Sequence, residues 1–350
     1  MNPTAWRAAH EDTFFLDPTD KVGLEHWLRQ ASLIGPGETL MSISPAENGN
    51  MNCTLRATTA RQSFVVKQSR PWVERYPQFA APWDRALREL EFYELIRERS
   101  AVASRMPRLL HFDAAARAFV LEDLGQLGDY TDVYRERMFT PSDVAILASW
   151  LSDLHGSFAH SSDRHDFANR EMRALNHEHI FEIPLRPGNG LDLDRITPGL
   201  ALEARRLQED PSFMANLRRI AALYLEDGAC LVHGDYFPGS FLRTVDGPRV
   251  IDPEFAHFGR AEFDVGVGLA HLLIARQPDN LIKSFLCGYK PGTSFDNGIM
   301  LQFAGAEIMR RLIGYAQLPL TINLGDKARL LAYARNMVVT PDRWQMSQAW

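Results

Sequence analysis

Two short stretches of this 350-residue chain place acidic residues directly after apolar runs. Leu231-Val232 leads into His233-Gly234-Asp235, and Val250-Ile251 leads into Asp252-Pro253-Glu254. An apolar run that ends abruptly in carboxylates predicts a short buried strand with acids presented at its end. Asp246-Gly247-Pro248 marks a turn between the two runs, so we expect a hairpin that brings the acids together.

Acids held this closely need a reason to coexist, because like charges repel and raise one another's pKa unless a cation lies among them. Oxygen ligands from one or two carboxylates suit Mg²⁺, which keeps several waters and often binds substrate phosphates. An acid beside such a metal can orient a hydroxyl for attack on phosphorus. Asp235 is therefore a candidate catalytic residue, and Asp252 and Glu254 are candidate metal ligands. The alternative is that these acids only cap the turns of a hairpin.

The same motifs resemble those of a known family. His233-Gly234-Asp235 is similar to the catalytic loop of the aminoglycoside phosphotransferase and choline kinase family, which is related to protein kinases. The run from Ile251 to Gly259, followed by Phe263-Asp264-Val265-Gly266, resembles methylthioribose kinases, in which an Asp-x-Glu pair replaces the kinase Asp-Phe-Gly. Gly239-Ser240 also fits that group, since its loop carries Gly-Ser where most relatives carry Asn.

The resemblance runs from about Glu47 to Leu318 and implies an α/β (α+β) protein-kinase-like fold with two lobes. We expect a small β-rich lobe over residues 1–123, with an N-terminal helical extension, and a larger, mainly helical lobe over residues 124–350. The implied cofactors are ATP, bound in the cleft between the lobes, and Mg²⁺, which bridges its phosphates.

Segments within residues 40–68 read as β structure with candidate nucleotide contacts. The turn Glu47–Asn52 joins two candidate strands, and a small loop with glycine can bring backbone N–H groups to phosphates. An Asn-Gly turn is more often only a hairpin connection. Lys67 ends the next strand, and the order loop, strand, strand with lysine is that of a kinase N-lobe. Gly49, Asn50 and Lys67 are thus nucleotide-binding candidates.

A helix is predicted over Pro82–Ser100 from its apolar stripe. The resemblance identifies Glu89 on this helix as the acid that pairs with Lys67. Glu91 and Glu94 are the alternatives, and a solvated helix face is the simpler interpretation.

Residues 119–125 form an apolar strand that passes into acids and then glycine. In kinases such a segment links the two lobes, and its backbone binds adenine. Glu122 and Leu124 are therefore further nucleotide-binding candidates, and the lobe boundary is expected near Leu124.

A second predicted helix, over Ala304–Ala316, contains adjacent arginines. Neighbours on a helix differ by about 100°, so we expect one of Arg310 and Arg311 to face inward or toward a cleft, against the alternative of two surface arginines. Methylthioribose kinases have twin arginines in the corresponding helix, where they contribute to the sugar site. The resemblance therefore implies that Arg310, Arg311 and Asp235 bind the acceptor.

The loop after Asp235 departs from the family pattern. Relatives usually continue with Leu-His, whereas this chain has Tyr236-Phe237 and then Pro238, which we expect to face the acceptor. Ser240 is a weaker metal ligand than the usual kinase Asn and is not assigned to the metal. Asp264 is expected to brace the catalytic loop.

The composition limits the remaining function classes. With 45% hydrophobic and 23% charged residues the chain is globular, and its net charge of -6 argues against a nucleic-acid partner. No window approaches 18 uninterrupted apolar residues, so no membrane span is expected. Three unclustered cysteines indicate neither a disulfide framework nor a zinc motif, which favours a cytoplasmic location.

These observations predict an ATP-dependent phosphotransferase that acts on an alcohol. The resemblance implies transfer of the γ-phosphate to a sugar hydroxyl, the anomeric hydroxyl of 5-methylthioribose or a related sugar, a methionine-salvage step. The alternatives are an aminoglycoside or amino-alcohol phosphotransferase, a catalytically silent nucleotide-binding protein and a metal-dependent phosphohydrolase. The expected partner is a small-molecule acceptor, without nucleic acid or membrane, and a homodimer is left open.

Overall fold

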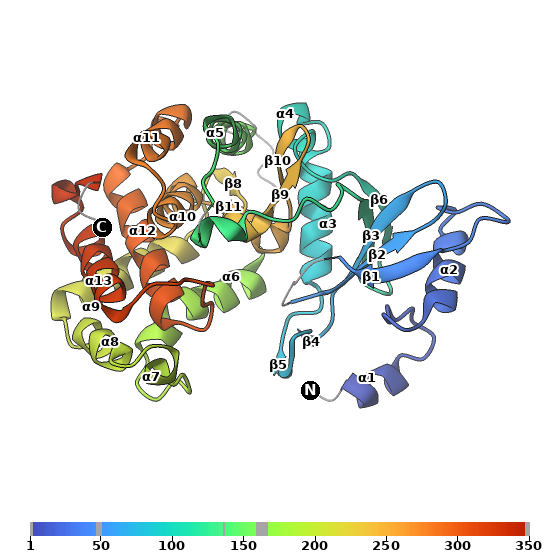
Figure 1. The fold of residues 1–350 in the computed structure, drawn as a ribbon, viewed down its shortest axis with the longest axis horizontal. Helices are drawn as coiled ribbons and strands as arrows, with labels where there is room; N and C mark the ends of the chain where they lie inside the picture. Colours follow the sequence, from blue (N-terminus) through green and yellow to red (C-terminus); the bar gives the residue numbers. More distant parts are fainter. Residues whose placement is uncertain (1–2, 47–50, 136, 159–166, 347–350) are drawn as a thin grey trace. The chain divides into compact units, whose positions relative to one another are not determined.

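The computed structural model describes residues 3–46, 51–135, 137–158 and 167–346 and divides into two compact units (Figure 1). The units are Met1–Gly128 and Asp129–Trp350. Within the described residues, every helix is too short or too polar to span a bilayer.

A five-stranded antiparallel sheet forms the centre of the first unit. Its strand order is β1 (Ser42–Pro45), β2 (Cys53–Thr58), β3 (Ser63–Gln68), β7 (Ala118–Glu122) and β6 (Leu109–Asp113). Lys67 lies opposite Thr54 on β2 and Phe119 on β7. Because ladders on both sides fix β3, the backbone that carries Lys67 is rigid.

Helices pack around this sheet. Helix α2 (Lys21–Gln30), capped by Asp20, buries Leu24 and Leu28 in the cluster that contains Leu55, Val66 and Val120 of the sheet. Helix α3 (Arg85–Ile96) buries Glu89 among apolar neighbours on its own face, and it is the helix predicted within 82–100. The remaining elements are α1 (Pro3–Ala9), α4 (Ser100–Ala103) and the small pair β4 (Trp72–Val73) and β5 (Tyr76–Ala80).

The second unit is mainly helical, as predicted. Helix α5 (Pro141–Gly156) begins with a capping box between Thr140 and Asp143. Helix α10 (Ala261–Ile274) is buried along its whole length, and α12 (Asn297–Ile313) is buried from Met300 onward. The other helices are α6 (Arg170–His177), α7 (Leu193–Ile196), α8 (Leu200–Gln208), α9 (Pro211–Leu225), α11 (Asp279–Gly288) and α13 (Leu324–Val339).

Two short strand pairs carry the acidic motifs. Strand β8 (Cys230–Val232) pairs with β11 (His257–Gly259), and β9 (Phe241–Thr244) forms a hairpin with β10 (Gly247–Val250). The Ile251 N–H then donates to the Ser240 carbonyl at 3.0 Å, one step beyond the hairpin register. Both acidic motifs therefore follow short strands, as predicted, but the Leu231-Val232 run pairs with β11 and the hairpin lies between β9 and β10.

Candidate active site

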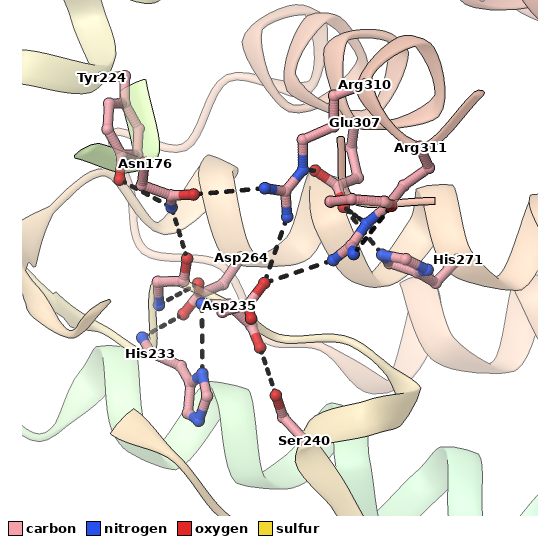
Figure 2. Close-up of polar contacts among 12 residues, drawn as sticks. Asn176, Tyr224, His233, Asp235, Ser240, Asp264, His271, Glu307, Arg310 and Arg311 are labelled. Atoms are coloured by element: carbon pink, nitrogen blue, oxygen red, sulfur yellow. Dashed lines mark hydrogen bonds and ion pairs between the residues drawn. The ribbon is translucent and has the colours of Figure 1, made fainter. Parts of the chain in front are cut away.

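Asp264, in the first turn of α10, holds the loop that follows β8. Its carboxylate accepts hydrogen bonds from the backbone N–H groups of His233 at 2.6 Å and Gly234 at 3.0 Å (Figure 2). The His155 Nε2 atom lies 3.1 Å from the same carboxylate. Burial acts to raise the pKa of Asp264, but these donors outweigh it and lower that pKa. The prediction that Asp264 braces this loop is confirmed, and His155 is a buried structural residue.

Gly234 lets this loop approach the second acidic motif. Its φ is +84°, and a Cβ atom at this position would lie 2.2 Å from the carbonyl oxygen of Phe255. Only glycine combines a positive φ with so close an approach of two backbones. The His233 Nε2 atom lies 2.9 Å from the Ile251 carbonyl oxygen, which ties the two motifs together a second time.

The carboxylate of Asp235 meets two guanidinium groups from α12. Its Oδ1 atom accepts from Arg310 Nη2 at 3.3 Å and from Arg311 Nη2 at 3.5 Å, and both arginines point at it in Figure 2. The side chain of Asp235 remains 23% exposed, whereas those of the two arginines are 6% and 7% exposed. The structure thus brings together three of the residues predicted from sequence.

Glu307 explains why both arginines face inward, as the resemblance implied, whereas helical geometry alone predicted only one. It precedes them by three and four positions on α12, so the three side chains lie on one face of the helix. Its Oε2 atom accepts from Arg310 Nε at 2.5 Å, and its Oε1 atom accepts from Arg311 Nε at 2.7 Å. Because both arginines donate to the Glu307 carboxylate, their side chains turn to the same side of the helix although their Cα atoms differ by about 100° around it.

Burial and charge shift the pKa values of these acids in opposite directions. Burial raises the pKa of Asp235, and the two guanidinium groups offset only part of that effect. For Glu307 burial also acts upward, but Arg310 and Arg311 outweigh it and hold its pKa well below the usual range. Asp235 is therefore the more basic of the two carboxylates that contact the arginines.

The second acidic motif adopts a constrained loop. Asp252 has φ +61° and precedes a short 3-10 helix, Pro253–Phe255. A positive φ at a residue other than glycine is uncommon and is often found at functional sites. The Asn169 Nδ2 atom donates to the carbonyl oxygens of Glu254 and Ala256, each at 2.9 Å, and holds the loop in place. Asp252 is half-buried and Glu254 is buried.

The described residues contain no group of three or more His, Cys, Asp or Glu side chains close enough to hold a metal ion by themselves. Asp252 and Glu254 nevertheless fit a metal that takes one or two protein carboxylates and fills its other positions with water and phosphate oxygens. The clamped loop supplies the fixed backbone that such a pair of ligands needs.

In the first unit, Lys67 on β3 pairs with Glu89 on α3. The Lys67 Nζ atom lies 3.0 Å and 2.8 Å from the two carboxylate oxygens, and both side chains are almost fully buried. Glu91 instead pairs with Arg88 at the surface, and Glu94 lies 53% exposed beside Arg97. The predicted pairing of Glu89 with Lys67 is confirmed.

The other residues predicted to bind the nucleotide are Gly49, Asn50, Glu122 and Leu124, and the structure describes two of them. Gly49 and Asn50 lie outside the described residues. The Glu122 N–H already donates to the Arg108 carbonyl at 2.9 Å within the sheet, so it is not available to a nucleotide. Among the described residues, none accepts a hydrogen bond from the Leu124 N–H, which stays available as a backbone donor.

Tyr236 corrects an expectation about the acceptor side. It is 1% exposed, its hydroxyl donates to the Leu147 carbonyl at 3.0 Å and its ring stacks on Trp150, so it belongs to the core. Phe237 does lie beside the arginines, with its ring centroid 4.4 Å from the Arg311 guanidinium carbon. The Ser240 hydroxyl donates to the Asp235 carbonyl at 2.8 Å and therefore supports the loop.

Sequence reasoning missed Glu307 and Asn176. Asn176 accepts from Arg310 Nη1 at 3.3 Å and donates to the Gly234 carbonyl at 3.1 Å, so it joins Arg310 to the loop that carries Asp235 (Figure 2). The spacing of Glu307 from the two arginines was a signal that could have identified it. Asn176 carries no such signal, because it lies more than a hundred residues from its partner on α12.

Comparisons with known proteins agree with this geometry. Methylthioribose kinase 2 of Oryza sativa subsp. japonica is 24% identical over 286 residues, which are 77% of this chain and 65% of that protein. A methylthioribose kinase of Exiguobacterium sibiricum is 26% identical over 251 residues, which are 66% of this chain and 61% of that protein. The chain therefore spans less than two thirds of the length of these relatives.

A solved structure of choline kinase from Streptococcus pneumoniae shares the fold. It superimposes with a TM-score of 0.53 and 16% identity, over 90% of this chain and 97% of that chain. The predicted α/β, protein-kinase-like fold, with a β-rich and a mainly helical part, is confirmed. The phosphotransferase enzyme family matches residues 42–298, which is most of the sequence, and the chain belongs to that family.

Proposed function

We propose that this protein is an ATP-dependent kinase that transfers the γ-phosphate to a hydroxyl of a neutral sugar, 5-methylthioribose or a close relative. The observation that carries the proposal is the shared contact of Arg310 and Arg311 with the carboxylate of Asp235. Membership of the phosphotransferase family and similarity to proteins named methylthioribose kinase support it.

Asp235 is the proposed catalytic residue. It orients the acceptor hydroxyl and takes its proton while the hydroxyl oxygen bonds to the γ-phosphorus and the bond to the bridging oxygen breaks, giving ADP and a phosphate ester. The raised pKa of Asp235, caused by its burial, makes its carboxylate a better base than an exposed aspartate. Asp264 acts through the loop, since it fixes the backbone on which Asp235 stands.

Lys67 is the proposed contact for the α- and β-phosphates of ATP, and Glu89 holds its ammonium group in place. The N–H group of Leu124 is the proposed backbone donor to the adenine base. Gly49 and Asn50, which the sequence also assigned to the phosphates, remain part of the proposal.

Asp252 and Glu254 are the residues that would hold Mg²⁺. When bound at such a site, Mg²⁺ neutralises charge on the phosphate oxygens. The chain's own contribution is the fixed loop, because the clamp by Asn169 and the contact between His233 and Ile251 hold both carboxylates on a rigid backbone.

The charge balance of the site favours a neutral acceptor over an aminoglycoside or amino alcohol. Two guanidinium groups balance the carboxylates of Asp235 and Glu307, and burial lowers the pKa of His271 to about 4, so that imidazole is neutral at pH 7. Among the described residues whose charges act on Asp235, no negative charge is left over to receive an ammonium group. The planar donor forks of arginine instead suit the hydroxyl and ring oxygens of a sugar.

An assay of ADP release tests the proposal, with 5-methylthioribose, other pentoses, choline, an aminoglycoside and no acceptor. We expect turnover that requires a neutral sugar and Mg²⁺. Turnover with only the amino alcohols, or equal turnover without any acceptor, would rule out the proposed substrate class.

The metal assignment has its own variant. Asp252→Asn removes a carboxylate but keeps a residue that tolerates a positive φ, so it should fold and lose Mg²⁺-dependent turnover. Asp246→Asn, on the exposed turn of the β9–β10 hairpin, is the matched control and should keep full turnover. A folded Asp252→Asn protein with normal ATP turnover would remove Asp252 from the site.

A further inference from the structure

A chain of buried polar groups continues from the twin arginines into the core of the second unit. His271 of α10 lies with its Nε2 atom 2.9 Å from Glu307 Oε1, and its Nδ1 atom lies 2.6 Å from the hydroxyl of Tyr134. Glu307 and His271 are 1% exposed and Tyr134 is 5% exposed. The proposed phosphate transfer assigns no step to these three residues, and Glu307 and His271 have entered so far only through the charge balance of the site.

The chemistry of the partners fixes the direction of each hydrogen bond in this chain. Glu307 is ionised and can only accept, so the His271 Nε2–H donates to it. Because His271 is neutral, its Nδ1 atom must accept, and the Tyr134 hydroxyl donates to it. Each donor therefore has one acceptor. The hydrogen bonds from Tyr134 to His271 and from His271 to Glu307 fix the orientation of the Glu307 carboxylate on the side away from Asp235.

Glu307 also determines which guanidinium atoms remain for the site. It takes the Nε–H of both Arg310 and Arg311. Their Nη1 groups donate to Asn176 and to the Ala316 carbonyl, so the Nη2 groups are the ones that face Asp235. A planar guanidinium anchored at Nε has little freedom to turn. The Nη2 groups of the two arginines are thus held against a single carboxylate oxygen, Asp235 Oδ1 (Figure 2).

We propose that Glu307, oriented by His271 and Tyr134, is a positioning residue that sets the spacing of the two guanidinium groups on Asp235 and balances their charge. This inference rests on the proposed kinase function, because the acceptor would be bound by these arginines. Without the charge of Glu307, two cations would face one carboxylate, and Asp235 would become a weaker base.

The titratable and charged groups that act on Asp235 include Arg310, Arg311 and Glu307 on α12, His233 on its own loop and the Tyr134 hydroxyl. The charge of Glu307 can therefore be tested separately from its shape. In Glu307→Gln the pKa of Asp235, measured by ¹³C NMR of labelled aspartate, should fall by about one unit. The acidic limb of the acceptor kcat/KM profile should move to lower pH by the same amount.

Glu262 provides a matched control. It is a buried glutamate of α10 whose Oε1 accepts from the Asp296 N–H at 2.9 Å, and it touches neither arginine. Glu262→Gln should leave the pKa of Asp235 and the acceptor kinetics unchanged. Glu307→Gln should lower the acceptor kcat/KM about tenfold or more with little change in the KM for ATP.

A shorter variant separates spacing from charge and protects the test against misfolding. Glu307→Asp keeps the charge, so the pKa of Asp235 should stay as it is in the unaltered protein. Acceptor kcat/KM should fall, because the shorter carboxylate no longer reaches both Nε atoms. Tyr134→Phe removes only the outermost hydroxyl and should cause a smaller loss of the same kind.

The outcomes distinguish the inference from the function on which it rests. If Glu307→Gln leaves both the pKa of Asp235 and the acceptor kinetics unchanged, Glu307 is merely structural and the inference is overturned. If the unaltered protein phosphorylates no acceptor, the proposed function fails, and the NMR shift still decides whether Glu307 controls Asp235.

Discussion

The two units differ in how they balance buried charge at their candidate functional residues. In the first unit one cation, Lys67, meets one carboxylate, Glu89, and the two come from a strand and a helix only 22 residues apart. In the second unit two carboxylates and two guanidinium groups alternate, so that Asp235 and Glu307 each contact both Arg310 and Arg311. Lys67 and Glu89 face each other as one cation and one carboxylate, whereas each charge of the cluster contacts two opposite charges.

The two arrangements of charge should respond differently to substitution. When one member of a buried pair is removed, the other charge is left without compensation, which typically costs about 3–5 kcal/mol. When one member of the four-charge cluster is removed, each remaining charge keeps at least one opposite neighbour. We therefore expect variants of the pair to act mainly on folding stability and variants of the cluster mainly on turnover.

The largest effect should come from Asp235, which lies at the solvent-accessible end of the cluster. Asp235→Asn keeps the shape and an acceptor oxygen but loses the base, so acceptor-dependent kcat should fall about 10²- to 10⁴-fold. Thermal unfolding should change little, because the arginines keep Glu307. Stopped assays of phosphate transfer, with unfolding followed by circular dichroism, measure both. A large loss of stability with retained turnover would contradict the comparison.

The pair in the first unit should respond in the opposite way. Glu89→Gln leaves the Lys67 ammonium without its buried carboxylate and should destabilise the protein by about 3–5 kcal/mol. Urea denaturation measures this loss. Lys67→Met together with Glu89→Gln removes both charges and should recover much of the stability, yet it should not recover ATP affinity measured by calorimetry. Recovery of both would mean that Lys67 has no contact with the nucleotide.

How much of this could be read from the sequence depends on the distance between partners along the chain. The order of elements around Lys67, and the apolar runs before Asp235 and Asp252, predicted the β-rich unit, the hairpin and the acids at its ends. The choice among Glu89, Glu91 and Glu94 followed from a motif, because helical spacing alone left all three possible.

Long-range partners were not predictable in the same way. Tyr236 was expected to face the acceptor because it follows Asp235, but it packs on Trp150 of α5, and no local pattern specifies that contact. The second inward arginine depends on Glu307, which was visible three positions before Arg310 but has no role until the helix is known to be buried. The Glu122 N–H donates to the Arg108 carbonyl, and this hydrogen bond can be recognised only when the pairing of the strands is known.

Acid should weaken the second unit through two buried histidines. Burial lowers the pKa of His257 and His271 to about 4, whereas the unfolded chain binds those protons near the ordinary value of 6.5. The free energy of unfolding is therefore unaffected by these two residues above pH 6.5. It decreases as the pH falls toward 4, by about 3 kcal/mol for each residue. Urea denaturation between pH 7 and 4 measures the slope, which His271→Gln should reduce. An unchanged slope would show that His271 is already protonated in the folded protein.

Arg310 and Arg311 should have intermediate and unequal effects. Each charge-assisted hydrogen bond is worth roughly 1.5–3 kcal/mol, so each single change to alanine should lower acceptor kcat/KM about 10- to 100-fold. Arg310 also contacts Asn176, which supports the loop that carries Asp235, so Arg310→Ala should lower kcat more than Arg311→Ala does. Steady-state kinetics with varied acceptor and saturating ATP separates the two. Near-normal acceptor kinetics in both variants would place the acceptor elsewhere.

The smallest effect should come from Glu91, two positions after Glu89 on the same helix. Its side chain is 38% exposed and 2.7 Å from Arg88, and such surface pairs contribute little. Burial and the nearby Glu94 raise the pKa of Glu91, so the folded state binds this proton more tightly than the unfolded state. Its ionised form is therefore slightly unfavourable at neutral pH, and that cost disappears as the pH falls below the folded pKa.

Glu91→Gln should change stability at pH 7 by no more than about 0.5 kcal/mol and leave ATP affinity intact. A loss comparable to that of Glu89→Gln would mean that the helix face, and not the pair with Lys67, carries the stability of the first unit.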